Sequence, residues 1–262
     1  MFIINFLYGL IIGLGFIIPG VSGGVIATIL GIYNEIIDRL NNLFNNFKNN
    51  LIYIIPIIIG VITSVLLFSN LILYLLENKL FYISYIFIGL ILGCIPYLIK
   101  EIKIKTNKNV AIIPFVISLL FGITLFFIEK TNISSFTTPN TLVMLIAGLL
   151  YAIGKIIPGI SGAALLMLLG VYEYFLSIIA NPLNLTIDIL LSFVPFIISF
   201  IISAIIILKL TSYLLNNHFR LSYSVIIGFV ISSILFIYPG SFSLLSIIII
   251  YFSFLISYHL SN

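Results

Sequence analysis

Long apolar stretches, separated by short polar segments, run through almost the whole 262-residue chain. A helix needs about 20 apolar residues to cross a bilayer. Segments of about this length lie near residues 51–76, 81–99, 110–128, 188–208, 221–238 and 242–258. Before each set of three, two shorter apolar arms flank a Pro-Gly break. The pattern predicts an all-α polytopic membrane protein.

The first break reads Ile17-Ile18-Pro19-Gly20-Val21-Ser22-Gly23-Gly24, and the second reads Ile156-Ile157-Pro158-Gly159-Ile160-Ser161-Gly162-Ala163. The arm over residues 3–18 would be about 24 Å long at about 1.5 Å per residue, short of the ~30 Å hydrocarbon core. Lipid tolerates a broken helix only where it is buried in protein or lines a polar cavity. We therefore expect re-entrant helical hairpins over about residues 3–37 and 141–180.

The second half of the chain repeats the first at a constant offset of 139 positions. Gly9 matches Gly148, and Pro56 matches Pro195. Both breaks continue into Gly-x-Tyr, at Gly31 and at Gly170. Such a repeat indicates internal duplication. We predict one membrane domain, 1–262, made of repeats 1–139 and 140–262, each a hairpin followed by three transmembrane helices.

Lysine and arginine are unevenly distributed between the predicted loops. The loops at 34–50, 100–109 and 209–220 hold eight of them, against Lys79 and Lys130 in the others. An excess of these residues marks the cytoplasmic side. With re-entrant hairpins, the three basic loops and both termini are cytoplasmic, and the two repeats have opposite orientations in the membrane.

Composition agrees with a membrane protein and excludes several function classes. The chain is 62% apolar and 7% charged, against roughly 25% charged in a soluble domain. A net charge of +4, spread along the chain, does not indicate nucleic-acid binding. The single cysteine, Cys94, excludes a disulfide framework, and the two histidines lack metal-ligand spacing. We predict no metal and no cofactor.

The breaks are the predicted substrate site. A helix that begins after such a break presents free N–H groups, which suit an anion. Serine can cap that end or donate to a ligand, and glycine allows close approach to the backbone. The predicted binding residues are Gly20, Ser22, Gly23, Gly24, Gly159, Ser161 and Gly162. Alternatively, the glycines serve only tight helix packing.

Lys155 adds a charge to this site. It lies three residues before Pro158, within an apolar arm, and its repeat mate is Phe16. Ionisable groups inside a membrane are costly and usually functional, and lysine is a good partner for phosphate. The alternative is that Lys155 extends to the membrane interface.

Further polar residues follow each hairpin. Glu35 and Arg39, with Asp38 between them, follow the first, and Glu173 follows the second. They could line an entrance or bind a coupling ion, H⁺ or Na⁺, or be ordinary boundary charges. Tyr33 and Tyr172 fit an interfacial aromatic belt, which we favour, or a donor to the ligand.

One motif points to a different class of protein. Gly20-Val21-Ser22-Gly23-Gly24 fits Gly-x-Ser-x-Gly, the pattern around the nucleophile of many serine hydrolases. No predicted strand precedes Ser22, and Ala163 breaks the pattern in the second copy. An intramembrane serine hydrolase using Ser22 or Ser161 with His259 stays the less favoured alternative.

The doubled motif resembles the bacterial polyprenyl-phosphate (undecaprenyl-phosphate) transporter family. The resemblance lies in Gly15 and Pro19 to Gly24, with Gly31-Ile32-Tyr33, and in Pro158 to Gly162, with Gly170-Val171-Tyr172-Glu173. Val25 stands where the family usually has Thr, and Asn34 where it commonly has Glu. The resemblance implies a flippase of the bacterial plasma membrane that returns the lipid carrier phosphate from the outer to the inner leaflet for cell-envelope synthesis. A carrier of small anions on the same scaffold is the other transporter reading.

Overall fold

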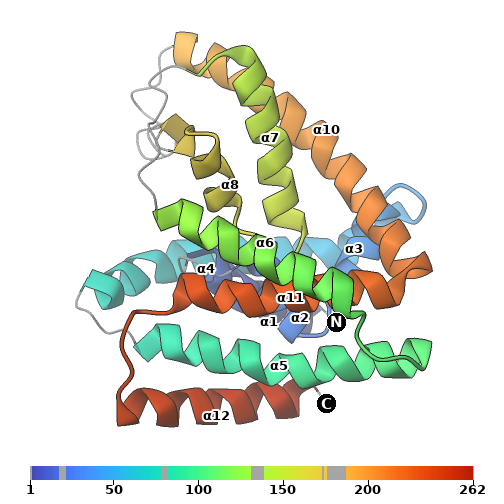
Figure 1. Cartoon of the computed structure of the whole chain (residues 1–262). Helices are drawn as coiled ribbons and strands as arrows, with labels where there is room; N and C mark the ends of the chain where they lie inside the picture. Colours follow the sequence, from blue (N-terminus) through green and yellow to red (C-terminus); the bar gives the residue numbers. More distant parts are fainter. Residues whose placement is uncertain are drawn as a thin grey trace.

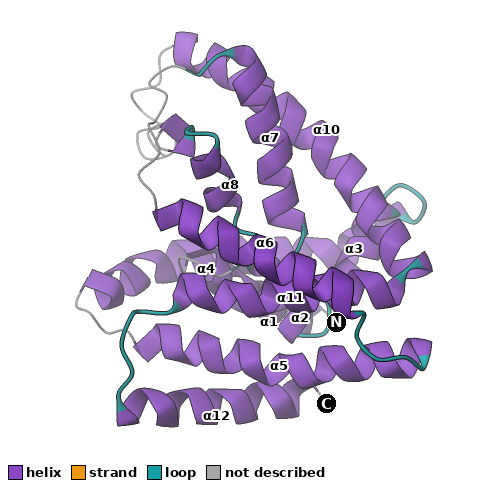
Figure 2. Cartoon of the chain, in the orientation of Figure 1, coloured by secondary structure: helices purple, strands orange, loops and turns teal. Residues whose placement is uncertain are grey.

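The computed structural model describes residues 2–17, 22–77, 82–130, 139–172, 174–175 and 187–261. These residues form eleven helices and no strand, which confirms the predicted all-α class (Figures 1 and 2). The helices are α1 (Phe2–Ile17), α2 (Gly23–Ile29), α3 (Tyr33–Asn41), α4 (Phe47–Glu77), α5 (Tyr82–Thr106), α6 (Ile112–Lys130), α7 (Thr141–Ile156), α8 (Gly162–Leu168), α10 (Ile187–Asn217), α11 (Phe219–Ile237) and α12 (Leu244–Ser261).

Four of the described helices are long and apolar enough to cross a membrane: α4, α5, α10 and α11. The helices α1, α6, α7 and α12 are apolar but contribute shorter spans. Helices α4 and α10 both have 31 residues, and each contains one proline, Pro56 and Pro195. The repeat offset predicted these matching positions.

The helices pack as four close pairs. Helix α1 lies along α4, α7 along α10, α5 along α12 and α6 along α11, with α5 and α11 also in contact. Figure 1 shows α7 and α10 running obliquely to the nearly parallel α5, α6, α11 and α12. The largest buried cluster lies where α2 and α5 meet α11, and its fully buried side chains include Ile26, Ile91 and Val230.

Glycine lets two of these pairs approach closely. A methyl group at Gly9 would overlap the carbonyl oxygen of Ile57, and one at Gly148 would overlap that of Phe196. These two contacts are related by the repeat offset. Small residues at such crossings allow the tight packing by which helices associate in lipid.

The connections lie at two opposite ends of the bundle. Figure 1 shows both termini and the α5–α6 and α10–α11 connections toward one end, at the right. The α11–α12 connection lies at the other end, at the left. We call the first the basic end, because segments 100–109 and 209–220 hold six lysines and arginines.

The second arm of each predicted hairpin is shorter than expected. Helix α2 ends at Ile29 and is followed by Gly31, whose φ is 72°; α8 ends at Leu168 and is followed by Gly170, whose φ is 70°. In the first case the N–H groups of Gly31 and Ile32 bond to the carbonyls of Thr28 and Ala27, a Schellman motif. The part of the predicted first hairpin that follows the break, up to about residue 37, is therefore formed by two helices, and Arg39 lies on α3 rather than in a loop.

Candidate functional site

The start of α2 and the second Pro-Gly break lie next to each other. A methyl group at Gly24 would be 3.3 Å from the Cα atom of Pro158, and α2 contacts α7. Residues far apart in the sequence are thus joined at one place inside the bundle. Gly20, also predicted for this site, lies outside the described residues.

Both serines cap the short helices that follow the breaks. The Gly24 N–H donates to Ser22 Oγ at 3.3 Å, and the Ala164 N–H donates to Ser161 Oγ at 3.1 Å. Each serine has the extended backbone typical of an N-cap. The capping that the sequence indicated is present, whereas phosphate binding by these hydroxyls stays a prediction.

We expect Ser22→Ala and Ser161→Ala each to lower the free energy of unfolding by about 0.5–2 kcal/mol, because each removes a cap. Transport should weaken without being abolished. Thermal melting and reconstituted transport would measure the two effects. Ser241→Ala, at an exposed loop side chain, is the control and should stay within about 0.5 kcal/mol of the parent. Complete loss of activity in only one of the two cap variants would instead favour a catalytic serine.

Lys155 lies beside an apolar cavity of about 310 Å³, which we call the Lys155 cavity. Its wall includes Phe16, Gly23, Gly24 and Tyr33, and its remaining side chains are apolar and come from α1, α2, α3, α4, α7 and α10. The cavity therefore combines one cation with hydrocarbon and with backbone at the start of α2. Of the residues predicted to bind substrate, it brings together Lys155, Gly23 and Gly24.

Two aromatic rings hold the ammonium group of Lys155. Its Nζ atom is 5.1 Å from the centre of the Phe16 ring and 5.0 Å from that of Tyr151. Such cation–π contacts contribute about 0.5–2 kcal/mol each, depending on exposure. Among the residues that the structure describes, Lys155 has no carboxylate partner. Its charge can thus be paired with an anion that enters the cavity.

Tyr33 is buried and makes a hydrogen bond within the protein, and its place in an interfacial aromatic belt stays a prediction. Its side chain is only 5% exposed. Its hydroxyl donates to the carbonyl of Ile156 at 3.0 Å. That carbonyl lies in the last turn of α7, where carbonyls lack partners within the helix. No local sequence pattern indicates this contact, because the two residues are 123 positions apart.

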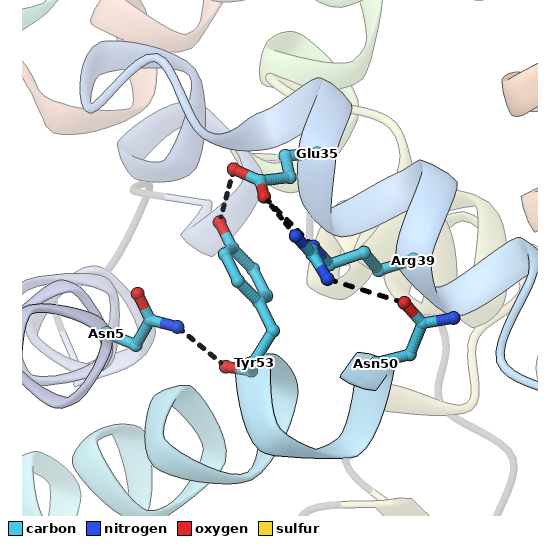
Figure 3. A network of polar contacts seen from close by, with 5 residues as sticks. All are labelled: Asn5, Glu35, Arg39, Asn50 and Tyr53. Carbon is cyan, nitrogen blue, oxygen red and sulfur yellow. Dashed lines mark hydrogen bonds and ion pairs between the residues drawn. The ribbon is translucent and has the colours of Figure 1, made fainter. Parts of the chain in front are cut away.

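Glu35 and Arg39 belong to a polar network on α3 and α4 (Figure 3). Arg39 pairs with Glu35 at 2.7 Å, and the Tyr53 hydroxyl donates to the second oxygen of Glu35 at 3.0 Å. The guanidinium also lies 4.2 Å from the centre of the Tyr53 ring. Asn5 donates to the Tyr53 carbonyl, and Arg39 donates to Asn50. The charge of Glu35 is already balanced, which favours a structural role over ion binding.

Sequence reasoning missed three members of this network: Asn5, Asn50 and Tyr53. Asn5 is 3% exposed and stands alone in an apolar arm. A buried amide must have a hydrogen-bond partner, so its position was the available signal. Asp38, nearby on α3, accepts from Ser212 of α10 at 2.9 Å, which ties α3 to the second half of the chain.

Gly159, Gly162 and Tyr172 do not line the Lys155 cavity. Gly159, with φ of 80°, packs against the backbone of Phe229 on α11. Gly162 packs near Tyr151 and Gly154. Tyr172 is half-buried beside a cluster of aromatic side chains. Glu173 lies outside the described residues.

The hydrolase alternative has no assembled nucleophile and base in the described part of the chain. Both serine hydroxyls accept helix N–H groups. The Nδ1 atom of His259 is 2.8 Å from the carbonyl of Leu255 on its own helix. A nucleophilic serine needs a base within hydrogen-bond reach, and neither Ser22 nor Ser161 contacts a histidine there.

Comparison with known proteins identifies the family. A search of curated proteins and a search of solved structures each gave no match. A family model described as VCA0040-like, undecaprenyl phosphate translocase-like, matches residues 12–248. That range covers both breaks, the Lys155 cavity and most of the helices. The chain therefore belongs to the undecaprenyl phosphate translocase-like family, as its paired motifs predicted.

Proposed function

We propose that this protein returns undecaprenyl phosphate, or a closely related polyprenyl phosphate, from the outer to the inner leaflet for reuse in cell-envelope synthesis. The observation that carries the proposal is the Lys155 cavity, where one cation lies beside hydrocarbon walls. A phosphate monoester carries about 1.5–2 negative charges at neutral pH, so its head cannot cross hydrocarbon unaided. The cavity offers that head a cation while the prenyl chain stays among apolar side chains.

The lining of the cavity favours a lipid over a small anion. Apart from Lys155 and Tyr33, its walls are aliphatic or aromatic side chains and glycine. The Tyr33 hydroxyl is already donated to Ile156. A small inorganic anion would therefore lose its hydration and gain one cation, with little else to replace the water. A prenyl phosphate gains the same cation and also buries its chain.

We further propose that the two halves are inverted repeats whose hairpins enter from opposite faces. Several contacts support this arrangement. Phe16 and Lys155, which are repeat mates, lie against each other. The pairs α1 with α4 and α7 with α10 are repeat equivalents, and so are α5 with α12 and α11 with α6. Such exchanged pairing is what a two-fold axis between the halves would produce.

Topology can be tested with single cysteines in a Cys94→Ser background. We expect Asn45→Cys and Asn107→Cys to react with impermeant maleimide only from the cytoplasm, and Ser241→Cys only from outside. The reason is the excess of lysine and arginine in the loops near the first two positions. Labelling of Asn45→Cys and Asn107→Cys from opposite faces would contradict the re-entrant hairpins.

The proposed function can be tested with purified protein in vesicles that hold undecaprenyl phosphate in one leaflet. We expect the protein to speed its transfer to the other leaflet, with H⁺ and Na⁺ gradients imposed in turn to identify a coupling ion. Inorganic phosphate uptake into the same vesicles is the comparison. Uptake of phosphate without lipid transfer would contradict the proposal and favour a small-anion carrier.

A further inference from the structure

A second cavity lies on the other side of Tyr33. It has a volume of about 340 Å³ and is lined by the end of α10, the start of α11, Tyr33 and Ile157 of the second break. Most of its lining is aliphatic, including Ile157, Leu214 and Val225. Polar groups come from Thr211, His218 and Ser222, beside the α10–α11 connection. We call it the His218 cavity.

The two cavities share one wall. Tyr33 lines both, while Ile156 lines the Lys155 cavity and Ile157 lines the His218 cavity. The hydrogen bond from the Tyr33 hydroxyl to the Ile156 carbonyl therefore lies at the boundary between them. Tyr33 and the backbone at Ile156 and Ile157 lie between the two spaces, so a movement of Tyr33 would bring the two cavities closer to continuity.

The charge around the His218 cavity suits an anionic head. The α10–α11 connection, which carries His218, lies at the basic end of the bundle (Figure 1). Segment 209–226 contains Lys209, His218 and Arg220 and no Asp or Glu. The nearby Asp38 is bonded to Ser212 and Asn216 and does not line the cavity. The Ser222 hydroxyl lies within hydrogen-bond distance of the carbonyls of Leu214, on α10, and His218, which leaves Thr211 and His218 as the groups that can donate to a ligand.

We propose that the His218 cavity is a second binding site for a prenyl phosphate, on the cytoplasmic side of the Tyr33–Ile156 contact. The aliphatic wall holds the first isoprene units, and the phosphate lies at the rim beside His218 and Thr211. Both cavities have volumes at the lower end of the ~300–1,000 Å³ found for ligand pockets. Each fits a head and a short part of the chain, with the rest of the chain in the bilayer. This inference rests on the proposed function, because it assigns the same lipid to a second position.

Protection of single cysteines from maleimide tests the second site. In a Cys94→Ser background, Leu214→Cys reports on the His218 cavity, Ile62→Cys on the Lys155 cavity, and Ile248→Cys on the outer face of α12. The three parent side chains are 37%, 53% and 43% exposed. With undecaprenyl phosphate at ten times its Kd, both cavity cysteines should react about tenfold more slowly, while Ile248→Cys keeps its rate.

The outcomes separate the second site from the proposed function. Protection of Ile62→Cys alone would overturn the second site and leave the proposed function standing. Protection of Leu214→Cys alone would support the second site and would overturn the proposal that the Lys155 cavity binds the lipid. Protection of neither would overturn both. Undecaprenol and inorganic phosphate are run in parallel, and equal protection of Leu214→Cys by undecaprenol would overturn the phosphate position at His218.

His218→Gln gives a matched check of the head position. It keeps a hydrogen-bond donor but removes the imidazole, and we expect protection of Leu214→Cys to fall at least about threefold while protection of Ile62→Cys is unchanged. Equal loss at both cysteines would mean that His218 acts on the fold or on the Lys155 cavity, and would overturn its role in a separate site. Unchanged protection at both would also overturn it.

Discussion

Lys155→Met should weaken the binding of undecaprenyl phosphate by roughly 10- to 150-fold. A hydrogen bond to a charged group contributes about 1.5–3 kcal/mol, which corresponds to that range of Kd. Methionine retains much of the bulk of the lysine side chain and its contacts with Phe16 and Tyr151, but not the charge. Lys155→Ala should behave similarly. Binding to purified protein, measured by titration with the lipid, would give the ratio.

Two further variants show whether the charge is responsible. Lys155→Arg should keep part of the affinity, since arginine also pairs with phosphate but fills the space differently. Lys48→Met, at an exposed position near the start of α4, should bind like the parent. Thermal melting of each variant controls for folding. If Lys155→Met binds like the parent, the charge of Lys155 does not contribute to lipid binding. The side chain would then only extend to the membrane interface and pack against Phe16 and Tyr151.

The sequence predicted those parts of the fold that depend on the length of the apolar segments and on the internal repeat. Six apolar segments predicted α4, α5, α6, α10, α11 and α12. The equal lengths of α4 and α10 and the matching prolines follow from the constant offset. These features are local, because a helix in lipid satisfies its own backbone and needs only an apolar surface.

Gly31 and Gly170 show where local reasoning could have gone further. Each predicted hairpin extends past Gly-x-Tyr, whereas the short helix ends just before the glycine. A glycine followed by an apolar residue is the usual form of a Schellman motif. Reading it that way would have predicted α2 and α3 as separate helices.

The candidate site depended on contacts that no local pattern encodes. Lys155 and Gly24 were both predicted to bind substrate. That they line the same cavity depends on how α2 packs against α7. The bond between Tyr33 and Ile156 depends on the same packing. A tyrosine near a predicted membrane boundary is most often interfacial, and only the three-dimensional arrangement shows that this one is buried.

Gly159→Ala is expected to lower the free energy of unfolding by about 2–5 kcal/mol. Gly159 has a φ of 80°, and the left-handed conformation costs a residue with a side chain about 1–2 kcal/mol. Its added methyl group would also lie 2.7 Å from the Val230 nitrogen and closer still to the Phe229 carbonyl. Forcing an extra group into a packed site costs about 1–3 kcal/mol more. Thermal melting and denaturant unfolding in the same detergent would measure the loss.

Gly31→Ala separates the two contributions to this loss. Gly31 has a similar φ of 72°, but the nearest atom to its added methyl group would be the Tyr97 hydroxyl oxygen at 3.6 Å, an ordinary contact. It should therefore cost only about 1–2 kcal/mol, and the difference between the variants measures the close approach of the second break to α11. Equal losses would contradict that packing role. If Gly159→Ala instead left stability unchanged and weakened lipid binding alone, Gly159 would act at the substrate, as the sequence first suggested.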